Sequence, residues 1–190
     1  YKYNPYSEAE FWFDESKIYL DSINCQFAFL SEDCSAIIPR IDYDTTLNCF
    51  NGFVTPIKNG KPIKSAFNCQ SFEELKHALE TKLCANLVNV HLLQPTSDSD
   101  LSGTPPATVL SAYGTDNKIT SIDILKRWLV IFKELYSRNI RILGFSTYGD
   151  PKYLRAMRLA SNFFVKTQTL NINNNLINNN NLIIISKFLI

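Results

Sequence analysis

The sequence predicts an α/β fold in which a mixed β-sheet is flanked by helices. Apolar residues make up 45% of the 190 residues and aromatic residues 13%, which is enough material for the core of one domain. Helical and strand-like hydrophobic patterns alternate in the order helix, three strands, helix, two strands, helix, strand, helix. Early strands in succession favour antiparallel pairs, and the final strand–helix–strand unit favours a parallel pair, so the sheet should be mixed.

The first part of the chain predicts one helix and three strands. Ser7 and Glu10 have the spacing of a capping box, so a helix is expected over 7–20. Pro39 confines the second strand to an edge or bulged position. The Asn-Gly and Pro of 58–64 indicate an exposed turn. The expected strands cover 26–30, 35–43 and 49–57, and the last two form a hairpin.

The second helix is expected over 71–83, where Ser71 and Glu74 again fit a capping box. One face of this helix carries the apolar residues Phe72, Leu75, Leu79 and Leu83. Two more strands follow it, over 86–93 and 107–113, on either side of a polar surface loop over 94–106.

The third helix is expected over 120–139, capped by Thr120 with Asp123. Its buried stripe is expected to consist of Ile122, Leu125, Leu129, Phe132 and Leu135. A strand over 140–146 follows directly, and a short helix over 150–164 comes next. We expect five segments to share one mixed sheet with the 120–138 helix packed on it: 27–31, 36–43, 49–55, 107–113 and 140–146.

Three regions are expected along the chain: an N-terminal helical segment over 1–24, a core over 25–165 and a tail over 166–190. Eight of the eleven residues from 171 to 181 are Asn, a composition typical of a tail without regular structure. Up to Asp150 there are 18 acidic and 14 basic residues, whereas five basic residues and no acidic residue follow it. A positive end on a slightly negative body favours an anionic partner.

Composition also excludes several classes. The five cysteines are odd in number and form no C-x-x-C pair, which is unlike a zinc site or a disulfide framework. We therefore expect reduced thiols in an intracellular, nuclear or cytoplasmic protein that is not secreted. The apolar segment 181–190 is too short to cross a bilayer and contains Ser186 and Lys187, so no membrane partner is expected.

Four segments together resemble a known family. They are "FAFLSEDCSAI" (27–37), "NGFVTPI" (51–57), "YGTDNKITSIDILKRWLVIFKEL" (113–135) and "IRILGFSTYGDPKYLRAMR" (140–158). In these segments the chain resembles transposase-like proteins of animal genomes related to P element and THAP-type transposases, over roughly residues 25 to 160. The resemblance implies a ribonuclease-H-like core, incomplete at its C-terminus, whose family chemistry is metal-dependent DNA strand transfer.

The resemblance also implies a site for two Mg²⁺ ions held by carboxylates from strands that converge at one end of the sheet. It places the first carboxylate at Asp33. The second is expected in the turn after 140–146, within the run Ser146-Thr147-Tyr148-Gly149-Asp150, where Tyr148 stands in the carboxylate's position. A tyrosine hydroxyl is neutral near pH 7 and is a poor Mg²⁺ ligand. The third ligand should lie downstream, but no acidic residue follows Asp150.

Alternatives remain open for each candidate residue. Asp150 precedes Pro151, so it is either a displaced metal ligand or the N-cap of the following helix. Asp33 is either an inherited metal ligand, within roughly 10 Å of Tyr148, or an ordinary strand-end residue. Glu32 is expected to be a solvated neighbour of Asp33. The basic face of Lys152, Arg155 and Arg158 either contacts phosphates or is the solvated side of the helix.

The expected function follows from these residues. The chain is predicted to be a fragment of a transposon-derived protein whose strand-transfer activity is lost, with DNA as a candidate partner. Two alternatives remain: a non-catalytic module that binds nucleic acid or protein, and a pseudogene-like product without a selected function.

Overall fold

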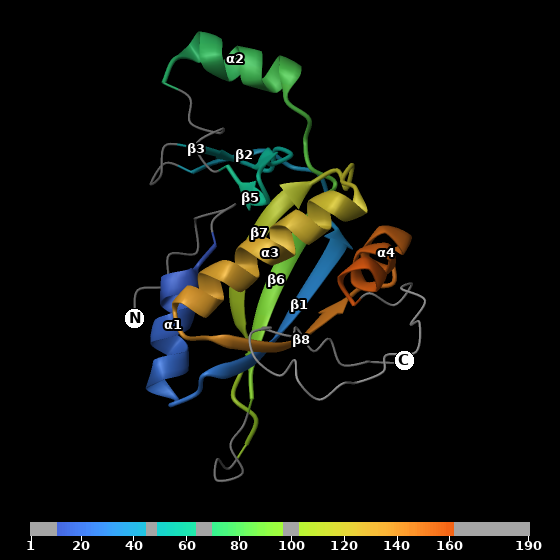
Figure 1. The fold of residues 1–190 in the computed structure, drawn as a ribbon. Coiled ribbons are helices and arrows are strands. Elements are labelled where there is room, and N and C mark those ends of the chain that lie inside the picture. The colour runs from blue at the N-terminus through green and yellow to red at the C-terminus, as the bar shows by residue number, and fades with distance from the viewer. Residues whose placement is uncertain (1–10, 45–48, 64–69, 97–102, 162–190) are drawn as a thin grey trace.

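The computed structural model describes residues 11–44, 49–63, 70–96 and 103–161. Its main sheet has four strands in the order β7-β6-β1-β8 (Figure 1). Strands β1 and β6 are antiparallel, as are β6 and β7, whereas β1 and β8 are parallel. These strands are β1 (Phe27–Ala36), β6 (Leu87–Pro95), β7 (Thr108–Thr115) and β8 (Arg141–Thr147). The expected α/β class with a mixed sheet is confirmed.

The 36–43 and 49–55 segments were expected in this sheet, and that expectation is wrong. The predicted strands over 26–30 and 35–43 are replaced by one strand, β1, which continues to Ala36. The next segments form two small ladders outside the sheet, β2–β3 and β4–β5. The exposed residues around Pro39 belong to no strand, so they separate β1 from the first ladder. The ladders comprise β2 (Asp42–Asp44) with β3 (Cys49–Asn51) and β4 (Ile57–Lys58) with β5 (Lys61–Pro62).

The β4–β5 hairpin contains the expected Asn-Gly turn. Asn59 and Gly60 both have positive φ, 52° and 80°, as such a two-residue turn requires. Gly60 also lies against the third helix: a Cβ built on it would lie 2.8 Å from the Cα of Arg127. Any side chain at this position would separate the hairpin from the helix.

The second, third and fourth helices begin at their predicted caps. Helix α3 (Ser121–Ser137) carries the full Thr120–Asp123 capping box, and α2 (Phe72–Thr81) begins with the Ser71 hydroxyl accepting from Glu74 N. Helix α4 (Pro151–Ala160) is capped by Asp150. Helix α1 spans Phe13–Ser22 with Trp12 as its N-cap, so it begins later than the helix expected over 7–20. The expected cap, Ser7 with Glu10, lies outside the described residues. The tail over 166–190 also lies outside them.

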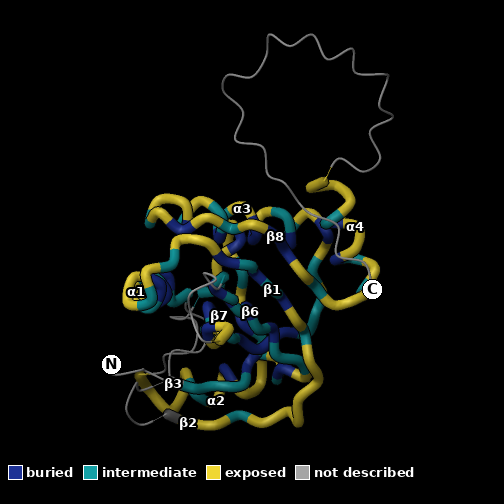
Figure 2. Tube along the Cα trace, turned by 90° about the horizontal axis from the view of Figure 1, so that it is seen from below, coloured by how far each residue is buried: buried dark blue, intermediate teal, exposed yellow. Residues whose placement is uncertain are grey.

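Helix α3 crosses the sheet, and α1 and α4 lie beside it (Figure 1). Figure 2 shows the buried positions concentrated along the strands and on the sides of α1, α3 and α4 that face them. The core includes Phe13 and Leu20 from α1, Leu30 from β1, Leu93 from β6, Leu110 from β7, Phe145 from β8 and Ala156 from α4.

The predicted stripe of α3 is wrong in phase. Ile122 and Leu129 are each 51% exposed, and only Leu135 of the predicted stripe is fully buried. The helix instead buries the face that carries Ile124, Arg127, Trp128, Ile131 and Leu135. Helix α2, by contrast, projects beyond the β2–β3 ladder (Figure 1). Its apolar residues Phe72 and Leu79 are exposed, as is Leu83 just after it.

Candidate functional site

Strand β8 ends beside Glu32 of β1, where the sequence predicted a site, and β1 continues to Ala36. The parallel register pairs Glu32 with Thr147, the last residue of β8. Asp33 and Tyr148 follow these two residues directly in the chain. The backbone therefore brings the turn over 148–150, which follows β8, close to Asp33, which lies inside β1.

Successive side chains of a strand point to opposite faces of the sheet, and this separates Asp33 from its neighbour. Asp33 is exposed, and its carboxylate accepts a hydrogen bond from Ser35 Oγ at 2.7 Å. Glu32 is 1% exposed and lies on the face covered by α3 and α4. The expectation that Glu32 is solvated is wrong, and Glu32 is the buried carboxylate beside the end of β8.

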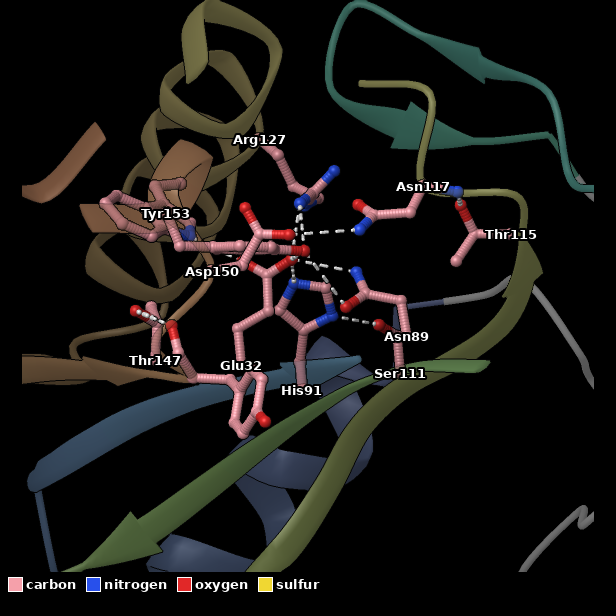
Figure 3. Close-up of polar contacts among 12 residues, drawn as sticks. Glu32, Asn89, His91, Ser111, Thr115, Asn117, Arg127, Thr147, Asp150 and Tyr153 are labelled. Carbon is pink, nitrogen blue, oxygen red and sulfur yellow. Dashed lines mark hydrogen bonds and ion pairs between the residues drawn. The ribbon is translucent and has the colours of Figure 1, made fainter. Parts of the chain in front are cut away.

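The Glu32 carboxylate is surrounded by four donors from three elements, α3, β6 and α4 (Figure 3). The guanidinium of Arg127 from α3 donates to Oε1 in a short ion pair. The indole of Trp128 donates to Oε2 at 2.6 Å. Two further donors reach Oε1, Asn89 Nδ2 from β6 at 2.8 Å and Tyr153 OH from α4 at 3.2 Å. Both carboxylate oxygens are thus bonded within the protein.

The charged groups of this cluster shift one another's pKa values toward the ionised forms. Burial alone would raise the pKa of Glu32, but the neighbouring His91 and Arg127 outweigh it and hold that pKa well below its usual range. Burial would likewise lower the pKa of Arg127, and the Glu32 carboxylate raises it instead. A buried ion pair of this kind requires that both charges keep their partners.

Two buried tyrosines complete the cluster as neutral groups. Burial raises the pKa of Tyr113 to about 12, and its hydroxyl accepts from Asn89 Nδ2 at 2.7 Å. Burial and the charge of Glu32 also raise the pKa of Tyr153. Both phenols therefore remain protonated and can donate hydrogen bonds at neutral pH.

The cluster contains a serine, a histidine and a carboxylate in succession. His91 Nδ1 lies 2.8 Å from Ser111 Oγ, and His91 Nε2 lies 3.4 Å from Glu32 Oε1. These residue types form the nucleophile, base and orienting acid of many hydrolases. Ser111 and His91 are 0% exposed, however, so Ser111 Oγ has no surface from which to reach a substrate. The arrangement is part of the core.

Asp150 acts as the cap of α4. Its Oδ1 accepts from Lys152 N at 2.8 Å, and its Oδ2 accepts from Asn117 Nδ2 at 3.3 Å. The N-cap interpretation of Asp150 is therefore confirmed. Tyr148, which stands in the position expected of a carboxylate, is 67% exposed.

The residues present do not fit a pair of Mg²⁺ ions. Glu32 is bonded to Arg127 and three neutral donors, Asp33 lies on the opposite face of β1, and Asp150 is turned to the first turn of α4. Within the described part of the chain, no three residues of the types His, Cys, Asp and Glu are grouped so that they could hold a metal ion. Mg²⁺ prefers several oxygen ligands without a competing cation among them.

The predicted basic face of α4 is only partly available. Lys152 Nζ donates to the backbone oxygen of Asn117 at 2.6 Å and lies 3.9 Å from Asp150 Oδ2. Arg155 and Arg158 are exposed. Contact with phosphates remains a prediction for these two exposed residues, and the Lys152 ammonium is bonded within the fold.

The sequence carried one signal for the cluster that was missed. In the strand over 86–93, the polar residues Asn89 and His91 are two positions apart. They alternate with the apolar residues Val88, Val90 and Leu92. Period-two polarity places both side chains on one face of the strand. That face proved to be the one covered by helices, so the polar residues had to find partners there.

Comparison with protein-family models, with curated proteins and with solved structures finds no match. Among the described residues, no helix has both the length and the apolar character that crossing a membrane requires.

Proposed function

We propose that the chain is a ribonuclease-H-like domain of transposase ancestry that contacts DNA without cleaving it. The arrangement of β1, α3 and β8 supports the ancestry, because the first strand and the strand after the long helix are adjacent and parallel. The register between Glu32 and Thr147 also supports it, since the resemblance requires acidic positions to converge at that strand end.

One observation carries the non-catalytic part of the proposal. The buried carboxylate at the strand end, Glu32, is neutralised by Arg127 and accepts hydrogen bonds from Trp128, Asn89 and Tyr153. A guanidinium occupies the position next to the carboxylate at which a catalytic cation would have to bind. The carboxylate thus stabilises the packing of α3 and α4 on the sheet.

The DNA contact is assigned to the exposed arginines of α4. Arg155 and Arg158 lie three positions apart on one side of the helix, a spacing that suits neighbouring phosphates. With so few cations the affinity should be low, independent of base sequence and strongly reduced by salt.

The test combines cleavage and binding on the purified full chain. With Mg²⁺ or Mn²⁺ and supercoiled DNA we expect no nicking. Labelled duplex DNA should bind weakly, and Arg155→Glu should weaken binding further, while Lys133→Glu, on exposed α3 surface, serves as a charge-matched control. Metal-dependent nicking that is lost in Glu32→Gln, with the fold intact, would refute the proposal. DNA binding that is insensitive to Arg155→Glu would refute the assignment of the surface.

A further inference from the structure

A pocket of about 530 Å³ lies between the β4–β5 hairpin, the end of β7 and the first turns of α3. It is separate from the Glu32 cluster and from the basic side of α4. Its volume lies within the range of small-molecule sites, which are roughly 300–1,000 Å³. The lining residues are Val54, Thr55, Ile57, Lys58, Asn59, Gly60, Thr115, Asp116, Lys118, Ile119, Asp123 and Lys126.

Three lysines give the pocket its positive charge. Lys58 comes from the hairpin, Lys118 from the loop after β7 and Lys126 from α3. Lys58 and Lys126 form no ion pair with any residue that the structure describes. Ammonium groups from three separate elements around one cavity are suited to an anion such as a phosphate.

The two acids of the pocket already have local partners. The Asp116 carboxylate accepts from Lys118 N at 3.0 Å and lies 3.3 Å from Lys118 Nζ. The Asp123 carboxylate accepts from the backbone and hydroxyl of Thr120 in the capping box. Hydrogen bonds from Thr120 and the charge of Lys126 lower the pKa of Asp123. The three lysines outnumber the two aspartates, so the lining keeps a net positive charge.

A buried hydroxyl gives an independent indication of a ligand. Thr55 is 4% exposed, lines the pocket, and has no hydrogen-bond partner for Oγ1 among the described residues. Its backbone N–H is bonded to Gly114 O at 2.9 Å, so the residue is fixed beside β7. A buried hydroxyl without a hydrogen bond lowers the stability of the fold, and a bound ligand could supply the missing partner. Thr115, also in the lining, accepts from Asn117 N at 3.0 Å and keeps its own proton to donate.

We propose that this pocket binds a phosphate monoester of a small sugar or polyol. The lysines would hold the phosphate, the hydroxyls of Thr55 and Thr115 would donate to ligand oxygens, and Asp116 would accept from a ligand hydroxyl. Val54, Ile57 and Ile119 offer a short apolar wall for the carbon skeleton. No aromatic residue is among those that line the pocket, so a nucleobase would find no ring on which to stack.

The test is calorimetric titration of the full chain with glucose 6-phosphate, glucose, inorganic phosphate and AMP. Glucose 6-phosphate should bind more tightly than either of its fragments and more tightly than AMP. Lys58→Ala and Lys126→Ala should each weaken binding by about tenfold. Lys133→Ala, an exposed lysine of α3 outside the lining, should leave the affinity unchanged.

Thr55→Val separates a binding role from a structural one. Removing a hydroxyl that has no partner should raise the melting temperature of the unliganded chain, while the affinity for glucose 6-phosphate should fall about threefold. The proposal is overturned if glucose 6-phosphate does not bind at millimolar concentration, or if Lys58→Ala and Lys126→Ala have no effect. Equal affinity for inorganic phosphate, or tighter binding of AMP, would overturn the ligand class.

Discussion

Glu32 and Asp33 are adjacent carboxylates on the same strand, yet their environments differ completely. Glu32 lies under α3 and α4 and accepts hydrogen bonds from four side chains, Arg127, Trp128, Asn89 and Tyr153, with His91 Nε2 3.4 Å away. Asp33 lies on the other face, exposed, with Ser35 as its partner. The comparison shows that the face of a strand decides whether a carboxylate acts as a structural charge or as a surface group.

The largest expected effect comes from exchanging each carboxylate for its amide. Glu32→Gln leaves Arg127 buried without its counter-charge, so the free energy of unfolding should fall by about 3–5 kcal/mol. Asp33→Asn is the matched control and should change it by less than about 0.5 kcal/mol. Urea denaturation followed by far-UV circular dichroism measures both. Similar losses in the two variants would show that the two faces do not differ as described.

A double variant sharpens the comparison by removing both charges together. Glu32→Gln with Arg127→Met leaves no uncompensated charge, so it should be less destabilised than the sum of the two single variants, with a coupling of about 2 kcal/mol. A four-state denaturation cycle measures this coupling. Additive single effects would mean that the two side chains do not act as a pair.

Acid should remove the contribution of Glu32 to stability. Because the pKa of Glu32 is lowered from 4.5 in the folded state, its contribution is fully present above that value and is lost as the pH falls below it. The loss should be about 1.4 kcal/mol per pH unit in the acid range. Asp123 and Glu134 also have lowered pKa values and contribute to the same pH dependence. The contribution of Glu32 is the part of the slope of unfolding free energy against pH that is lost in Glu32→Gln. Denaturation at stepwise lower pH measures this slope in both proteins. An unchanged slope would contradict the lowered pKa.

Asp150 is expected to give the smallest effect. Its carboxylate caps α4 at the surface, and Asp150→Ala should lower the free energy of unfolding by about 1 kcal/mol. Asp150→Ser, which retains a capping oxygen, should recover most of this loss in thermal denaturation. A loss as large as that of Glu32→Gln would indicate a role beyond the cap.

Much of the fold could be predicted because its signals are local. The capping pairs at Ser71 and Thr120, the Asn-Gly turn and the alternation of strands and long helices all depend on neighbouring residues. That the end of β8 lies beside Glu32 and Asp33 of β1 followed from a family resemblance and agrees with the register.

The phase of α3 and of β1 could not be predicted from these signals. Helix α3 carries apolar residues around most of its circumference, so the sequence offers two candidate buried faces, one with Ile122 and Leu129 and one with Ile124 and Trp128. The face that is buried also contains Arg127, and an arginine usually indicates an exposed face. Strand β1 likewise has apolar residues in both phases, Phe27 and Phe29 against Ala28 and Leu30. Only the partners across the sheet decide which phase is buried, and these are far away in the sequence.

The ion pair between Glu32 and Arg127 joins residues 95 positions apart, and Tyr153 lies 121 positions from Glu32. During synthesis, β1 leaves the ribosome long before α3 and α4 exist. Until then its carboxylate has no counter-charge, and the helix-covered face of the sheet cannot close. Because contacts of such sequence separation form late and slowly, we expect the domain to fold after translation rather than in stages along the emerging chain. Its nascent N-terminal half would then be the part most in need of a chaperone.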